Sequence, residues 1–176
     1  MKKNLFILFL IFLIPIKAFA LIEVDITRGN LNPLPLAVSP LSIDNNSKKS
    51  FENILKKENI GSEISIIVEN NLRTSGLFNP LNKDAFLQAP DIANLKPRFE
   101  DWNLIKAQAL ITGKVKYVDE KLRVEFRLWD VLAAKEMMAL AFTTVPSNWR
   151  RVGHIISDKV YERLTGEKGY FDTRII

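Results

Sequence analysis

The 176-residue sequence has no cysteine and a single histidine, His154. A chain without cysteine forms no disulfide, carries no thiol nucleophile and offers no thiolate ligand to zinc. One histidine also leaves a catalytic triad or a histidine-based metal site without the partners that it needs. At about 100° per residue, His154 falls nearly opposite the apolar stripe of its predicted helix, so we interpret it as a solvated surface residue.

Glycine-rich phosphate loops are missing as well, and the stretch GEKG at 166–169 is typical of a helix stop. The carboxylates of Asp119, Glu120, Asp130 and Glu136 fall in or beside predicted turns, where we expect them to be solvated. The tryptophans are expected to anchor the core rather than to form a ligand platform. These are Trp102, Trp129 and Trp149. We therefore predict no enzymatic activity, no metal, no cofactor and no small-molecule substrate.

The first residues of the chain carry two lysines, then the apolar run 5–16, and lead to the motif Ala18-Phe19-Ala20. This order predicts a secretory signal peptide over residues 1–20 that is removed on export. A permanent membrane anchor would need about 20 apolar residues, which is more than this run supplies. No cysteine follows the predicted cleavage point, so a lipoprotein is not indicated.

Removal of the signal peptide changes the charge balance of the chain. Three of the 25 basic residues are lost, which leaves 22 against 20 acidic residues and lowers the formal net charge from +5 to +2. A nucleic-acid-binding domain is expected to keep a basic stripe after processing. Nucleic acid is therefore not an expected partner.

Alternation of apolar and polar residues predicts several strands. They fall at 21–27, 36–39, 109–115, 122–131 and 137–144, and the closing residues 168–176 alternate in the same way. The sequence YVDEK between two of these strands predicts a hairpin turn. Residues 42–59 are polar and rich in lysine and asparagine, so we predict a solvated loop with a helical turn near 51–55.

Apolar residues spaced by three and four predict two main helices. One begins near Ser62, which we expect to cap it, and ends at Gly76; the other begins at Ser147 and ends at Gly166. Ile66 lies away from the apolar stripe of the first helix, which suggests cover on both faces. A short helix is also predicted at 98–106. These elements predict an α/β (α+β) fold: a mixed β-sheet with two main helices packed on one face, preceded by a cleavable signal peptide.

The predicted strand 21–27 lies next to the amino terminus that cleavage would create. Its apolar residues at 22, 24 and 26 alternate with acidic residues at 23 and 25. The pattern favours an ordinary edge strand of the domain's own sheet. The alternative is a mobile strand that adds to the sheet of a partner by β-augmentation.

Two longer stretches resemble signatures of the amino-terminal domain of the TolB family. They are LRTSGLFNPL at 72–81 and WRRVGHIISDKVYERLTGEKGYFDTRI at 149–175. The segments IEVDITRG and PLPLAVSPL also lie where the family has its corresponding segments. TolB is the soluble periplasmic component of the Tol–Pal envelope system of Gram-negative bacteria.

The resemblance implies a mixed α/β domain followed by a β-propeller, with partner binding divided between the two. It implies that the mature amino terminus binds TolA and that this reverses the pattern-based preference for the first strand. Carried over by position, the partner-binding residues are Ile22, Glu23, Val24, Asp25, Ile26, Thr27, Arg28 and Gly29. Pal, the peptidoglycan-associated lipoprotein, is bound mainly by the propeller, which puts Pal binding in doubt here.

The predicted organisation therefore has four parts. They are the signal peptide 1–20, the partner-binding strand 21–30, the TolB-like domain 31–168 and a lead-in to a propeller at 169–176. The expected function is that of a non-enzymatic periplasmic adaptor that supports outer-membrane integrity and envelope constriction at division. The alternative is a truncated TolB remnant or a stand-alone periplasmic interaction module, and a hydrolase that uses His154 is the distant third.

Overall fold

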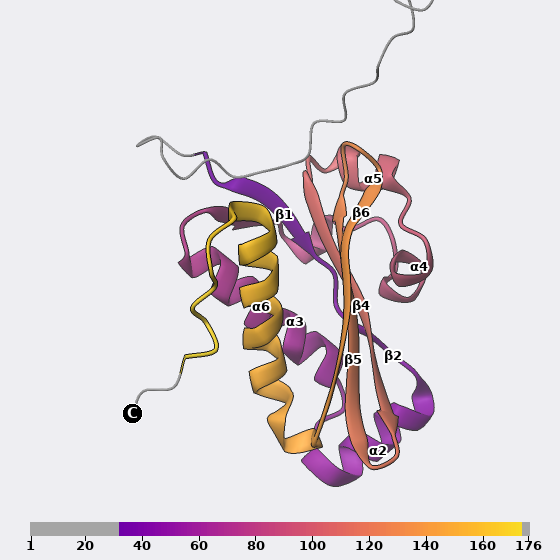
Figure 1. The fold of residues 1–176 in the computed structure, drawn as a ribbon. Helices are drawn as coiled ribbons and strands as arrows, with labels where there is room; N and C mark the ends of the chain where they lie inside the picture. Colours follow the sequence, from indigo (N-terminus) through magenta and orange to yellow (C-terminus); the bar gives the residue numbers. More distant parts are fainter. Residues whose placement is uncertain (1–31, 174–176) are drawn as a thin grey trace, which may run out of the picture.

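The computed structural model describes residues 32–173 (Figure 1). The predicted signal peptide, the predicted strand 21–27 and the last three residues of the chain lie outside this range. The elements in chain order are β1 (Leu34–Val38), β2 (Ser42–Ile43), α2 (Asn45–Leu55), α3 (Ile60–Thr74), β3 (Phe78–Pro80), η1 (Lys83–Ala85), α4 (Pro90–Leu95), α5 (Phe99–Leu104), β4 (Ala109–Val118), β5 (Lys121–Asp130), β6 (Lys135–Thr144), η2 (Pro146–Asn148) and α6 (Trp149–Thr165).

The sheet is mixed, as the sequence predicts. Its strand order is β3-β1-β4-β5-β6, and β2 pairs with the far part of β4. Strand β1 runs parallel to both β3 and β4, whereas β4, β5 and β6 form an antiparallel meander. Asp119 and Glu120, both with positive φ, form the two-residue turn between β4 and β5. That geometry fits the right-handed twist of a hairpin, so the predicted turn is confirmed.

Two long helices cover one face of the sheet, and two short helices lie on the other. Figure 1 shows α3 and α6 together on one side, with α4 and α5 across the sheet from them. Alternate residues of β5 point toward α3 and α6 and are fully buried, among them Val124 and Leu128. On the opposite face Trp102 of α5 packs with Leu110 of β4 in a smaller cluster. The predicted α/β class, a mixed β-sheet with helices, is confirmed, with partial cover added on the second face.

The prediction of a loop over residues 42–59 is wrong, because most of it is helix α2. Asp44 caps this helix by accepting a hydrogen bond from the backbone N–H of Ser47 at 2.9 Å. The hydroxyl of Ser47 also accepts from the N–H of Tyr117 on β4. Phe51, fully buried, packs edge-on against the Tyr117 ring at 5.5 Å between centroids. One aromatic anchor and a cap therefore hold a helix whose other residues are polar.

Other local predictions need correction. Helix α3 begins at Ile60, so Ser62 is not its cap, and Ile66 is 46% exposed rather than covered. The stretch between Gly76 and Leu95, for which the sequence predicts no helix or strand, contains β3, η1 and α4. Gly76 does adopt a left-handed conformation, with φ of 75°, and ends the helix region as predicted.

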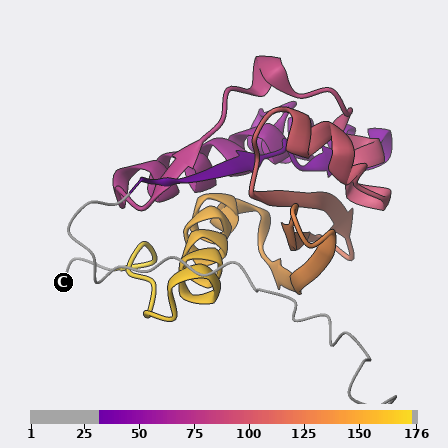
Figure 2. The same cartoon turned by 90° about the horizontal axis from the view of Figure 1, so that it is seen from above.

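The chain beyond α6 is not a strand as far as the structure describes it. Gly166 ends α6 with φ of 75°, and the segment that follows folds back beside the helix (Figure 2). The carboxylate of Asp158 accepts from the N–H groups of Phe171 and Asp172 at 2.6 and 3.1 Å. Arg151 donates to Asp172 from the preceding turns of α6. Side chains thus satisfy the backbone groups that a strand would have paired.

Candidate functional site

The predicted partner-binding residues 22–29 lie outside the described residues. The first described strand after them is β1. Strand β1 is central, because Leu34 pairs with Phe78 of β3 while Leu36 pairs with Ala109 of β4. Both sides of β1 are therefore occupied. Within the described sheet β2, β3 and β6 each have a side without a paired strand.

An aromatic cluster lies next to the beginning of β1. Phe78, the partner of Leu34, contacts Tyr161 of α6 at 6.1 Å between ring centroids. Tyr161 in turn contacts Tyr170 and Phe171 at 5.5 and 5.9 Å. Burial raises the pKa of Tyr161, and the neighbouring Tyr170 and Glu167 act in the same direction. This end of the domain therefore offers apolar ring surface, with Tyr170 half exposed.

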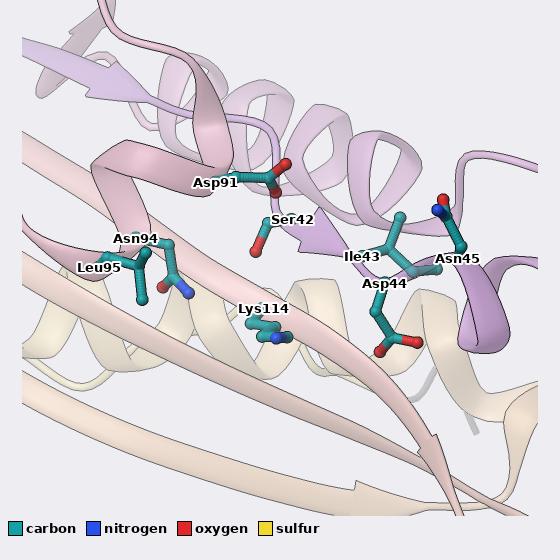
Figure 3. A pocket seen from close by; sticks show the side chains of 8 residues that line it. All are labelled: Ser42, Ile43, Asp44, Asn45, Asp91, Asn94, Leu95 and Lys114. Carbon is teal, nitrogen blue, oxygen red and sulfur yellow. The ribbon is translucent and has the colours of Figure 1, made fainter.

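A pocket of about 380 Å³ lies between β2, the start of α2, helix α4 and β4 (Figure 3). Its polar lining comes from Asp91 and Asn94 of α4, Lys114 of β4, and Ser42 and Asp44. Two of these groups have structural roles, since Asp44 caps α2 and the Ser42 hydroxyl donates to the carbonyl of Gly113. A hydrogen bond from the Ser47 backbone, with others from Ser47 and Asn46 and the charge of Lys114, lowers the pKa of Asp44 against a smaller effect of burial.

Asn94 and Lys114 are among the groups of this pocket that the structure leaves available, together with Asp91 and Asn45. Asn94 is 9% exposed, and its Oδ1 has no hydrogen-bond partner within the described part of the chain. Lys114 forms no ion pair within 4.0 Å among residues 32–173. Ser42, the one hydroxyl in the lining, donates to the Gly113 carbonyl and to no base. The pocket is large enough for a small polar group.

His154 lies between the two long helices and is partly buried, so its interpretation as a solvated residue is wrong. Its Nδ1 is 2.9 Å from Nδ2 of Asn71 on α3, and the same amide donates to the hydroxyl of Ser157 at 3.0 Å. This arrangement joins α3 to α6. Within residues 32–173 no group of three or more His, Cys, Asp or Glu could hold a metal ion. Over the same range no helix is long and apolar enough to span a membrane.

The remaining sequence candidates divide between the core and the surface. Asp130 is 1% exposed and accepts from the N–H of Ala133 at 2.8 Å, so the prediction that it is solvated is wrong. Asp119, Glu120 and Glu136 are exposed, as predicted. The tryptophans are buried or half-buried, which confirms their interpretation as anchors. They are Trp102, Trp129 and Trp149.

Comparisons with known proteins agree with the resemblance in the sequence. Residues 22–137 match the family model described as the TolB amino-terminal domain. Over 174 residues the chain is 87% identical to the Tol-Pal system protein TolB of Pelagibacter ubique (strain HTCC1062), covering 99% of this chain and 39% of that protein. Among solved structures it is similar in fold to TolB from Acinetobacter baumannii, with a TM-score of 0.63 and 23% identity over 86% of this chain and 33% of that chain. The chain thus spans well under half the length of the TolB proteins that it matches.

Proposed function

Because this chain belongs to the TolB family, we propose that it acts in the periplasm as a non-enzymatic adaptor of the Tol–Pal system. The family match carries the proposal, since it begins at residue 22 and so includes the segment that the family uses for partner binding. The described side chains add a second, negative argument. His154, Ser157 and Asn71 are joined in a link between two helices rather than in a catalytic arrangement.

The adaptor binds TolA through residues 22–29. The sequence alternates Ile22, Val24 and Ile26 with Glu23 and Asp25, so an extended conformation would place the apolar side chains on one side and the acidic ones on the other. An added strand gains affinity from main-chain hydrogen bonds and specificity from alternate side chains.

Binding of TolA to variants of the mature chain tests this proposal. Isothermal titration calorimetry should show loss of affinity when residues 21–30 are deleted. The deletion leaves the described core intact, because the first strand of that core begins at Leu34; circular dichroism would verify this. Unchanged affinity of the deletion variant would overturn the proposed binding segment.

A matched pair of substitutions separates the apolar from the polar side of the segment. Val24→Asp places a charge where an apolar anchor is required, and affinity for TolA should fall by about tenfold or more. Glu23→Gln keeps the size of the side chain and leaves the apolar anchors unchanged, so its effect on affinity should be smaller. Equal effects of the two substitutions would contradict the assignment of the anchors.

Coupling in the cell distinguishes the adaptor from a stand-alone interaction module. An adaptor supports outer-membrane integrity and constriction of the envelope at division, so its loss should increase leakage of periplasmic proteins and delay constriction. The Val24→Asp variant should reproduce these defects while remaining soluble in the periplasm. Normal envelopes with this variant would instead favour a module without a role in Tol–Pal coupling.

A further inference from the structure

The edge of the sheet at β6 is long and lacks the features that usually protect an edge. Among residues 32–173, β6 pairs with β5 alone, so the backbone groups on its other side have no strand partner. Its ten residues carry charge only at Lys135 and Glu136, and the stretch Met137–Thr143 has neither charge nor proline. Edges are normally blunted by shortness, charge, proline or a bulge. Most of β6 is therefore open to an added strand.

The start of β6 is the protected part. The pairing register shifts between Leu128 and Trp129, opposite Met137, which marks a bulge. The carbonyl oxygen of Met137 also accepts a hydrogen bond from Nε of Arg163 on α6 at 3.3 Å. The accessible edge is thus 138–143, which we call the open edge.

Apolar side chains of the open edge reach the rim of the main core. Met138, Leu140 and Phe142 lie opposite buried residues of β5, and Phe142 stacks on Phe126 at 6.0 Å between ring centroids. Leu140 remains 37% exposed. An added strand with apolar residues on this side would extend the core and cover Leu140.

The other side of the open edge is small and bordered by charge. Ala139 and Ala141 lie opposite Arg127 and Glu125 of β5. Because alanine is short, a hollow of about 270 Å³ opens above these residues, with Arg123 also in its lining. Side chains of a strand beside β6 could reach across the alanines into this hollow.

The hollow favours an acidic side chain. Three cations, Arg123, Arg127 and Lys116, lie around the single carboxylate of Glu125. Arg123 donates a hydrogen bond to Glu125 at 2.8 Å, and with Lys116 and Arg127 it holds the pKa of that carboxyl below its usual range although burial opposes this. With Lys114 on the same face, cations outnumber the carboxylates of Glu125 and Glu136.

We propose that the open edge docks an extended segment of another protein in which apolar residues alternate with acidic ones. The apolar residues lie beside Leu140 on the helix side, and the carboxylates reach over Ala139 and Ala141 toward Arg127 and Arg123. A second copy of this chain fits less well. Antiparallel pairing of β6 with β6 would place alanines beside alanines and leave the hollow unfilled.

Two capped synthetic peptides of eight residues test the proposal on the mature chain. One alternates valine with glutamate and the other alternates valine with lysine. Fluorescence anisotropy should show micromolar binding of the acidic peptide and about tenfold weaker binding of the basic one. Equal binding of both peptides, or binding of neither, would overturn the proposal.

A carboxylate introduced into the hollow provides the decisive variant. Ala141 is exposed, so Ala141→Glu should fold normally. It fills the hollow and repels carboxylates, and the preference between the two peptides should reverse. Ala141→Ser, the matched control, should leave the preference unchanged.

N-methylation of alternate peptide amides should remove binding in one of the two possible patterns, because ladder hydrogen bonds are then lost. Binding that survives both patterns would be electrostatic attachment and would contradict strand addition.

Two further controls separate the other occupants of the edge. Peptide binding that appears only after deletion of residues 21–30 would assign the open edge to the chain's own alternating segment and overturn the proposal. Self-association in sedimentation experiments that Ala141→Glu abolishes would assign it to a second copy, with the same consequence. The Ala141→Glu variant should still bind TolA. Failure of the peptide experiments at the open edge would therefore leave the proposed function intact.

Discussion

One face of the sheet is covered along its length by α3 and α6, whereas the other is covered by α4 and α5 at one end only (Figure 1). The first face buries large apolar side chains from every strand that crosses it. The second face buries a small cluster around Trp102 and leaves the charged residues of β5 half exposed. Stability thus depends mainly on the first face, whereas the half-exposed second face and the edge beside it remain accessible to a partner.

The largest effect that tests this division is expected within α3. Ile64 is fully buried against the sheet, and Ile64→Ala should lower the free energy of unfolding by about 2–5 kcal/mol. Ile66 lies two residues away and is 46% exposed, so Ile66→Ala should change it by less than about 0.5 kcal/mol. Urea unfolding followed by circular dichroism measures both. Similar losses would mean that α3 is covered on both faces.

A smaller effect is expected from the cover of the second face. The Gln88 side chain accepts from Nε1 of Trp102 and from the N–H of Arg98, and it donates to the carbonyl of Lys96. Gln88→Ala leaves these buried groups without partners and should cost about 1–3 kcal/mol. Hydrogen exchange should show faster opening of 90–104 than of α6.

A graded variant sharpens the role of this side chain. Trp102→Phe keeps a ring in the small cluster but removes the hydrogen bond to Gln88 and part of the buried ring volume. Its loss of stability should also be about 1–3 kcal/mol, because a lost hydrogen bond and a small cavity both contribute. If exchange accelerates equally across α3 and α6 in either variant, the two faces unfold together and the comparison between them fails.

The success of sequence prediction also differs between regions of the fold. Strands β4 to β6 were predictable because their alternation is long and the turn at Asp119 and Glu120 is polar. Helix α2 was not, because its stability depends on a cap by Asp44 and one buried ring, Phe51, rather than on an apolar stripe. Helix α4 has only six residues, and its large apolar side chains Ile92 and Leu95 are exposed, so the sequence carries no apolar stripe that would predict it.

The candidate surfaces show the same limit. The segment 22–29 was assigned by resemblance to a family, and its pattern alone favoured an ordinary edge strand. The strand β6 was predicted from its alternation, but its position at the edge follows from strand order, which depends on contacts between residues far apart in the chain. The hollow over Ala139 and Ala141 depends in addition on the register with Arg127 and Glu125.

On the half-exposed second face of the sheet, removal of a cation should hardly affect the free energy of unfolding. Arg127 is paired with Glu136 at 3.3 Å, and both side chains are more than a third exposed. Exposed pairs contribute little because water and salt screen them. Arg127→Ala should therefore change the free energy of unfolding by less than about 0.5 kcal/mol, measured by urea unfolding, while weakening binding of the acidic peptide. A loss comparable to that of Ile64→Ala would show that this face stabilises the fold.

The smallest effect concerns the pH dependence of stability on the same face. The hydrogen bond from Arg123, together with Lys116 and Arg127, keeps the pKa of Glu125 below 4.5 in the folded chain although burial raises it. A carboxyl whose folded-state pKa is lowered contributes stability that is present above the unfolded-state pKa and lost as pH falls through the folded-state value. Glu125→Gln removes this contribution, so its free energy of unfolding should fall less steeply below pH 4.5 than that of the parent chain.

The difference should amount to about 0.2–0.5 kcal/mol, because the side chain of Glu125 is 28% exposed and its ion pair is screened. Urea unfolding at a series of pH values measures it. Salt supplies the control, since about 1 M NaCl shortens the range of charge interactions to roughly 3 Å and should bring the two pH profiles together. Identical profiles at low salt would show that the cations of β4 and β5 do not act on this carboxyl. The positive potential that favours an acidic strand at the open edge would then lose its support from Glu125.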